Sequence, residues 1–178
     1  MKRHPLYGML AEFESPEALL EAARKTQAAG YKRMDAFTPM PVEGLAEAVG
    51  FHRTRLPLVV LIGGILGGSF GFSMCYYANV ISFPLNIGGK PYNSWPMWIP
   101  ITFELTILGA ALSCVFGMLA MNGLPAPYHP VFNVARFALA SRDRFFLLVK
   151  ARDRQFEPAK TRAFLQSLNA REVSDVEV

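Results

Sequence analysis

The stretch LPLVVLIGGILGGSFGFSMCYYAN, residues 56–79, and its counterpart IPITFELTILGAALSCVFGMLAM, residues 99–121, decide the fold of this chain. Each is longer than the about 20 residues that an α-helix needs to cross about 30 Å of hydrocarbon. A helix of this length in a water-soluble protein would show a polar face, and neither stretch has one. We therefore predict two transmembrane helices.

The segment between these helices, residues 80–98, predicts a loop outside the membrane. It is rich in proline, glycine and asparagine, and the rings of Tyr92, Trp95 and Trp98 suit the headgroup zone. Of the 18 Lys and Arg residues, eight precede the first helix, one (Lys90) lies in the loop and nine follow the second helix. This bias predicts a hairpin with both termini in the cytoplasm.

The two flanking regions share one pattern of elements. Residues 1–55 read as a strand at 7–13, a helix at 17–28, a second strand at 31–37 and a short helix at 42–49. Residues 143–178 read as a strand at 144–152, a helix at 158–169 and an edge strand at 172–178. Neither half is large enough to bury a core alone.

Joined, the two halves match the split βαβ plan of ferredoxin-like domains. We therefore predict an α+β membrane protein in which a two-helix transmembrane hairpin is inserted into a split ferredoxin-like cytoplasmic domain. The juxtamembrane segment 122–142 contains an apolar stretch with Arg136, and we expect that stretch to lie along the inner membrane surface or against a neighbouring subunit. His129 stands alone beside Pro130 and is more typical of a structural hydrogen bond than of a ligand or quinone site.

Small residues recur every four positions on both apolar helices. Such spacing lets helix backbones approach closely in lipid. The first helix carries two adjacent glycine rows, which is more than one hairpin partner needs, so we infer a second helix neighbour from another chain; the alternative is that the extra glycines only thin the helix. We expect Gly109 to lie at about the depth of Gly68. The predicted packing residues are Gly63, Gly64, Gly67, Gly68, Gly71, Gly109, Ser113 and Gly117.

Glu104 is the only formal charge within the two apolar helices, about 8 Å below the outer end of the second one. Such a residue is costly in a membrane and is a functional candidate. Ser73, Tyr76 and Tyr77 fall at matching depth and could hydrogen-bond its carboxyl. Three interpretations of Glu104 stay open: a contact that holds an assembly together, part of a proton path, or a side chain that extends to the membrane–water interface without a protein partner.

The sequence predicts no cofactor in this chain. It contains no CxxC motif and no cluster of cysteine and histidine. In an antiparallel hairpin Cys75 and Cys114 differ in depth by about 16 Å, whereas a disulfide needs Cα atoms within about 7 Å. Both cysteines should be unlinked. The net charge of +4 is divided between the two ends without a dense basic cluster, which disfavours nucleic-acid binding.

Several blocks spread along the whole chain resemble one family. They are residues 38–45, 83–91, 94–96, 100–104, 125–132 and 143–146, and they include FPLNIGGKP in the loop and PITFE in the second helix. The chain resembles the small two-span membrane subunit of bacterial alternative complex III, a quinol:cytochrome c oxidoreductase. The resemblance implies a place in the bacterial inner membrane beside polytopic quinol-handling subunits, with haems and iron–sulfur clusters in the multihaem cytochrome and iron–sulfur partners.

Three functions are consistent with these features. The first is a non-catalytic structural subunit of an electron-transfer complex, with lipid and the larger subunits as neighbours. The second is a contributor to a proton path through Glu104. The third is a stand-alone regulatory domain tethered to the membrane, although no glycine-rich phosphate loop supports it. Co-purification with other subunits would favour the first function over the third.

Overall fold

The computed structural model describes residues 6–51 and 53–178, which fall into two compact units. The first unit comprises Met1–His52 and Pro127–Val178, and the second comprises Arg53–Ala126. The first unit is therefore built from both ends of the chain, and the second from its apolar middle.

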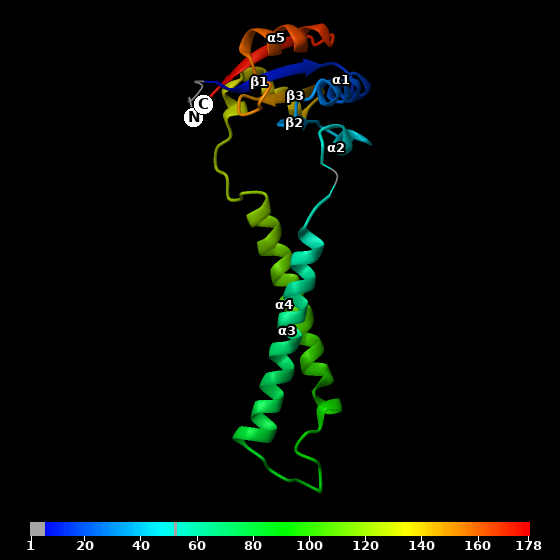
Figure 1. Cartoon of the computed structure of the whole chain (residues 1–178), viewed down its shortest axis with the longest axis vertical. Helices are drawn as coiled ribbons and strands as arrows, with labels where there is room; N and C mark the ends of the chain where they lie inside the picture. Colours follow the sequence, from blue (N-terminus) through cyan, green and yellow to red (C-terminus); the bar gives the residue numbers. More distant parts are fainter. Residues whose placement is uncertain (1–5, 52) are drawn as a thin grey trace. The chain divides into compact units, whose positions relative to one another are not determined.

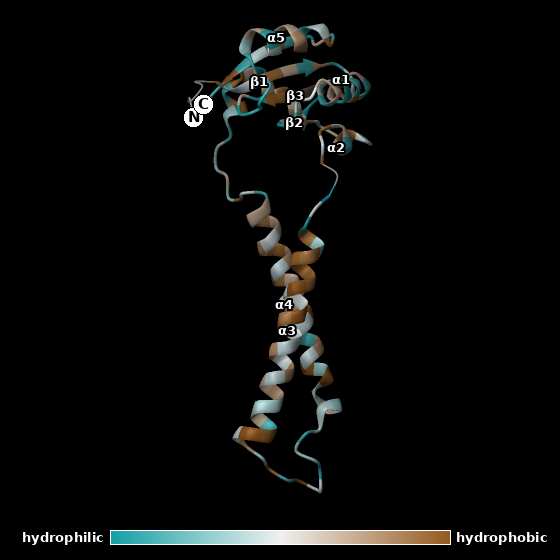
Figure 2. Cartoon of the chain, viewed as in Figure 1, coloured by the Kyte–Doolittle hydropathy of each residue, from teal (hydrophilic) through white to brown (hydrophobic). Residues whose placement is uncertain are grey.

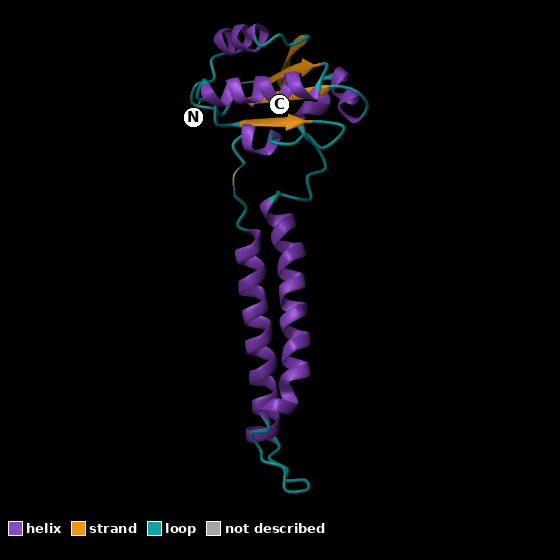
Figure 3. Cartoon of the chain, turned by 90° about the vertical axis from the view of Figure 1, so that its right-hand side faces the viewer, coloured by secondary structure: helices purple, strands orange, loops and turns teal. Residues whose placement is uncertain are grey.

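The first unit contains a four-stranded antiparallel sheet (Figures 1 and 3). Its strands are β1 (Leu6–Phe13), β2 (Met34–Phe37), β3 (Phe145–Lys150) and β4 (Glu172–Glu177), in the order β2-β3-β1-β4. Strand β1 pairs with β3 on one side and with β4 on the other, so that Ala11 lies opposite both Leu147 and Val173. Each half of the chain therefore pairs with strands of the other half, and the sheet needs both.

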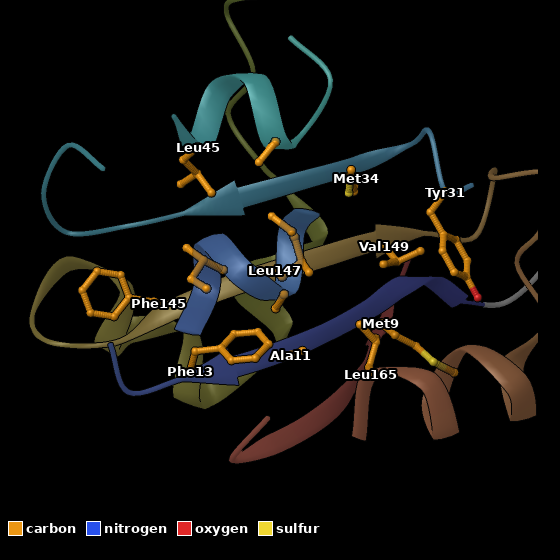
Figure 4. Close-up of a cluster of buried hydrophobic side chains, with 14 residues drawn as sticks. Met9, Ala11, Phe13, Tyr31, Met34, Leu45, Phe145, Leu147, Val149 and Leu165 are labelled. Carbon is orange, nitrogen blue, oxygen red and sulfur yellow. The ribbon is translucent and has the colours of Figure 1, made fainter. Parts of the chain in front are cut away.

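One face of the sheet is covered by helices. These are α1 (Pro16–Ala28), α5 (Pro158–Ser167) and the short α2 (Leu45–Ala48). Helix α1 begins as predicted, because the Ser15 hydroxyl accepts a hydrogen bond from the Ala18 N–H at 3.2 Å. Figure 4 shows the core that these helices bury. Its labelled members include Met9, Ala11, Phe13, Phe145, Leu147, Val149 and Leu165.

The other face of the sheet is covered by the segment that follows α4. Alternation along β1 and β3 turns Leu10, Phe146 and Leu148 to this face, where they form a second core with Val131 and Phe137. The latter two lie on the short helices η3 (Pro130–Asn133) and η4 (Ala135–Ser141). We expected this apolar stretch to contact the membrane or a neighbour; its buried side chains instead complete the sandwich, because an apolar sheet face must be covered.

His129 anchors this covering segment to β1. Its Nε2 lies 3.2 Å from the Tyr7 hydroxyl, and its Nδ1 accepts the Val131 N–H at 3.4 Å. The ring also packs edge-on against Tyr7 and Phe37. These contacts give His129 a structural place in the domain.

A buried carboxylate ties the same segment to the sheet. Glu12 on β1 is 2% exposed, and Arg136 donates from Nε and Nη2 to its two oxygens, each at 2.7 Å. Arg144 and Arg171 approach it at 3.7 and 4.0 Å. The hydrogen bonds from Arg136 and the three positive charges outweigh the burial and hold the pKa of Glu12 below its ordinary value.

A second buried carboxylate explains why β2 is shorter than predicted. Burial raises the pKa of Asp153, but hydrogen bonds from the backbone N–H groups of Gln155, Lys32 and Arg33 lower it, and the net shift is downward. The N–H groups of Lys32 and Arg33 both donate to Asp153 Oδ2 at 2.7 Å. These two N–H groups therefore bind a side chain instead of a neighbouring strand, and β2 begins at Met34.

The second unit contains two long apolar helices. Helix α3 (Leu56–Tyr76) continues as a π-helical turn, η1 (Tyr77–Ser82), and α4 (Ile99–Met121) follows the single turn η2 (Trp95–Trp98). Residues 56–82 and 95–121 are each long and apolar enough to cross a membrane, and brown, hydrophobic segments recur along both helices in Figure 2. The α-helix α4 has the bounds that the sequence predicted for the second helix, and its crossing of a membrane stays a prediction. The first helix does not end at Asn79, because the turn widens and the Phe83 N–H donates to the Ala78 carbonyl.

The interleaved sheet predicts that the first unit folds without the apolar helices. We expect a shortened chain, in which about 12 glycine and serine residues replace residues 53–126, to be soluble and to show cooperative thermal unfolding by circular dichroism. A matched chain that lacks residues 51–141 also loses Val131, Arg136 and Phe137. It should unfold at lower temperature or aggregate. Equal stability of the two chains would contradict the finding that residues 130–141 cover the second face of the sheet.

The Glu12 ion pair predicts a stability that depends on pH. Substituting Glu12→Gln should lower the free energy of unfolding by about 2 kcal/mol at pH 7, since the buried partner loses its charge while the arginines keep access to water. Because the folded pKa lies below the ordinary value of 4.5, this contribution is complete above about pH 4.5 and disappears as the pH falls through the folded pKa. Urea unfolding at several pH values measures it. The control Glu14→Gln, at an exposed carboxyl, should change little.

Candidate functional site

The contact between α3 and α4 is made by glycines that bring the two backbones together. A Cβ on Gly109 would lie 2.5 Å from the Gly63 carbonyl oxygen, and a Cβ on Gly63 would lie 2.8 Å from the Gly109 carbonyl oxygen. Gly67 also faces this point, since its Cβ would lie 3.3 Å from the Gly109 Cα and would overlap the Leu105 carbonyl. No side chain fits at these three positions without moving a helix.

The other predicted packing residues extend this contact in both directions. Gly71 lies against Leu105 and Thr102, and Gly117 lies against Val59 and Leu56, so the helices run antiparallel. The Ser113 side chain occupies the space beside Gly63. Figure 3 shows the two helices side by side along their length.

The register differs from the expectation that Gly109 would lie at the depth of Gly68. Gly109 meets Gly63 and Gly67 instead. Gly67 and Gly68 differ in depth by only about 1.5 Å, but they point about 100° apart around α3. Gly67 therefore faces Gly109, whereas Gly68 faces Thr106.

The second glycine row, Gly64 and Gly68, lies closest to side chains of α4 rather than to its backbone, and a Cβ on Gly68 would lie 2.5 Å from Thr106 Oγ1. A Cβ on Gly64 would lie 3.6 Å from the Ala110 Cβ and 3.7 Å from Thr106, which are ordinary contact distances. A groove of about 370 Å³ opens here along the helix pair. Its lining is apolar or small: Val60, Leu61, Gly64, Ile65, Gly68, Thr106 and Ala110.

A second hollow of about 280 Å³ adjoins this groove and shares Thr106 with it. It is lined by Phe72, Trp95, Ile99, Thr102, Phe103 and Thr106. The Thr106 hydroxyl donates to the Thr102 carbonyl at 2.7 Å, while the Thr102 hydroxyl has no hydrogen-bond partner among the described residues. The sequence-based prediction missed this side of α4, although Thr102, Thr106 and Ala110 follow each other at four-residue intervals.

Glu104 does not join the hydroxyl groups that the sequence placed at its depth. Its side chain is exposed, and within residues 6–51 and 53–178 no hydrogen bond or ion pair links it to Ser73, Tyr76 or Tyr77. Successive residues of an α-helix are about 100° apart. Glu104 therefore points away from the face of α4 that carries Gly109.

Cys75 and Cys114 are both free thiols, as expected from their depths. Over the described part of the chain, no group of three or more His, Cys, Asp or Glu side chains is placed to hold a metal ion.

The surface of the helix pair is largely uncovered. In the most apolar 18 residues of each helix, 22% of the first helix and none of the second is buried within the chain.

A family model described as alternative complex III, ActD subunit, matches residues 7–175. The chain belongs to the ActD family. The match covers both halves of the sheet and both apolar helices, so it applies to the chain as a whole. No match was found among curated proteins.

As a member of the ActD family, the chain is a subunit of alternative complex III, a complex of the respiratory electron-transport chain. The two helices long enough to cross a membrane fit a membrane location for such a subunit. Membership also means that other subunits are available to cover the exposed helix surface.

Gly67 and Gly64, one from each glycine row, predict different responses to the same substitution. Gly67→Ala forces a Cβ into the Leu105 carbonyl, so the helices must separate, and we expect a loss of about 1–3 kcal/mol in stability. Gly64→Ala adds only ordinary contacts and should be neutral or slightly stabilising. The stability of each variant is measured on the chain purified in mild detergent, as the loss of helicity when sodium dodecyl sulfate is added. Equal effects would contradict the assigned register.

Proposed function

We propose that this chain is a non-catalytic structural subunit whose transmembrane hairpin packs against larger polytopic subunits of a quinol:cytochrome c oxidoreductase. The observation that carries the proposal is the groove over Gly64 and Gly68. Close helix packing in lipid depends on small residues. Thr106 and Ala110 of α4 lie against this row, but the groove beside it stays open in the isolated chain. A helix of another subunit would fill the groove.

The first unit supports an anchoring role on one side of the membrane. Its strand order and antiparallel pairing agree with the split βαβ plan of ferredoxin-like domains. We propose that this domain lies in the cytoplasm and that residues 83–94 lie in the periplasm, with the hairpin in the bacterial inner membrane. The sheet requires both ends of the chain, which agrees with two crossings.

In this proposal the redox groups belong to other subunits. Haems would lie in the multihaem cytochrome subunits, iron–sulfur clusters in the iron–sulfur subunit, and quinol would be handled by the polytopic subunits. This chain would contribute helix contacts, lipid contacts and a folded domain to the assembly.

The two alternatives have less support. A proton path through Glu104 needs further polar groups beside it, and Ser73, Tyr76 and Tyr77 do not hydrogen-bond it. A stand-alone regulatory domain does not require an uncovered helix surface, and the family match is to a subunit of a complex.

Filling the groove tests the proposed function. Ile65→Trp enlarges a side chain that lines the groove and is 58% exposed in the isolated chain, so the isolated chain should keep its stability. Recovery of the chain with the other subunits from mild detergent should fall by about tenfold. Ile65→Leu serves as the control and should assemble. Normal recovery of Ile65→Trp would exclude the groove as the contact.

A further inference from the structure

The face of α4 around Glu104 is a second uncovered surface of the helix pair. Within the described residues Glu104 has neither a hydrogen-bond partner nor an ion-pair partner, and its side chain is exposed. Ile101, Leu108 and Val115 lie on the same side of α4, two helical turns apart from one another, and are 42%, 51% and 50% exposed. This surface is separate from the groove, because Glu104 and Thr106 are about 160° apart around the helix.

The carboxyl is too deep to be an ordinary surface charge. It lies about 8 Å inside the helix from Ile99 and farther from Trp95, whose exposed ring suits the headgroup zone. A carboxylate in hydrocarbon is costly unless a donor binds it. The described part of the chain supplies no such donor, since none of the α3 hydroxyl groups hydrogen-bonds this carboxyl.

The chemistry of the missing partner follows from the charge. In a medium of low dielectric a carboxylate is best matched by a cation that also donates hydrogen bonds. A row of apolar side chains with one buried polar position is also the arrangement by which packed helices select one partner and one register. The apolar members supply contact area, and the single charge supplies selectivity.

Resting on the proposed structural function, we propose that the Glu104 face docks a transmembrane helix of a polytopic partner subunit that presents an arginine or lysine to this carboxylate. The hairpin would then be held between two neighbours, one seated in the glycine groove and one paired through Glu104. The partner's basic side chain would likewise be buried without a counter-charge when this chain is absent.

The test uses the intact complex and three forms of this chain: wild type, Glu104→Leu and Glu104→Gln. Both variants should fold, because Glu104 is exposed and forms no hydrogen bond or ion pair with the described residues. We expect recovery of the chain with its partner subunits to fall by about tenfold for Glu104→Leu and clearly for Glu104→Gln, because the partner's cation loses its counter-charge. Phe116→Leu, on another exposed side of α4, is the control and should assemble normally.

A photo-activated cross-linking residue at position 108, one turn along the same face, gives the second readout. Cross-linking to a single polytopic subunit supports the proposal. Lipid adducts alone, or normal recovery of either Glu104 variant, overturn it and leave a lipid-facing or proton-carrying carboxyl. If the wild-type chain itself fails to co-purify with the other subunits, the proposed function fails; if only the Glu104 results are negative, the failure belongs to this inference.

Discussion

The pairing of β1 with both β3 and β4 is the constraint on which the rest of the structure depends. β1 comes from the first 13 residues, whereas its two neighbours come from the last 34. The domain therefore cannot form until the residues between the two halves bring them together. An antiparallel pair of helices returns the chain toward its starting point and a single long helix would not, so the helix pair and the sheet are compatible. Glu12 with Arg136 and Asp153 with the N–H groups of Lys32 and Arg33 reinforce the same closure, because each joins residues more than 100 positions apart.

The two rows of small residues in the helix pair make different contacts. Gly63, Gly67 and Gly109 bring the backbones of α3 and α4 together, and each position excludes a side chain. Gly64 and Gly68 leave a groove, while Glu104 lies on a different side of α4. The two helices pack tightly against each other, while the groove and the Glu104 side of α4 have no partner among the described residues. Such a helix pair suits a subunit that stands between larger neighbours. In the proposed arrangement, helix packing and one charge pair would hold the chain in the complex.

The sequence predicted the parts of the fold that depend on periodicity and end signals. The bounds of α4, the Ser15 cap of α1 and the β-α-β pattern of each half followed from residue type and spacing. The sequence did not predict the features set by contacts between distant residues. Asp153 shortens β2 by binding the N–H groups that precede it, and residues 130–141 cover the second face of the sheet, which no local pattern reveals. At the candidate site the glycine rows were predictable, but which row meets the backbone of α4, and where Glu104 points, depended on which faces of the two helices meet.

Accessibility of single cysteines in intact cells tests the central claim most directly. Cysteine would be placed at Glu17 in the N-terminal half, at Lys160 in the C-terminal half and at Lys90 in the loop, in a chain whose Cys75 and Cys114 are replaced by serine. A membrane-impermeant maleimide should label position 90 from outside and should label positions 17 and 160 only after the cells are opened. Labelling of 17 and 160 from opposite sides of the membrane would contradict the proposed topology, because the two halves of the sheet could not then meet.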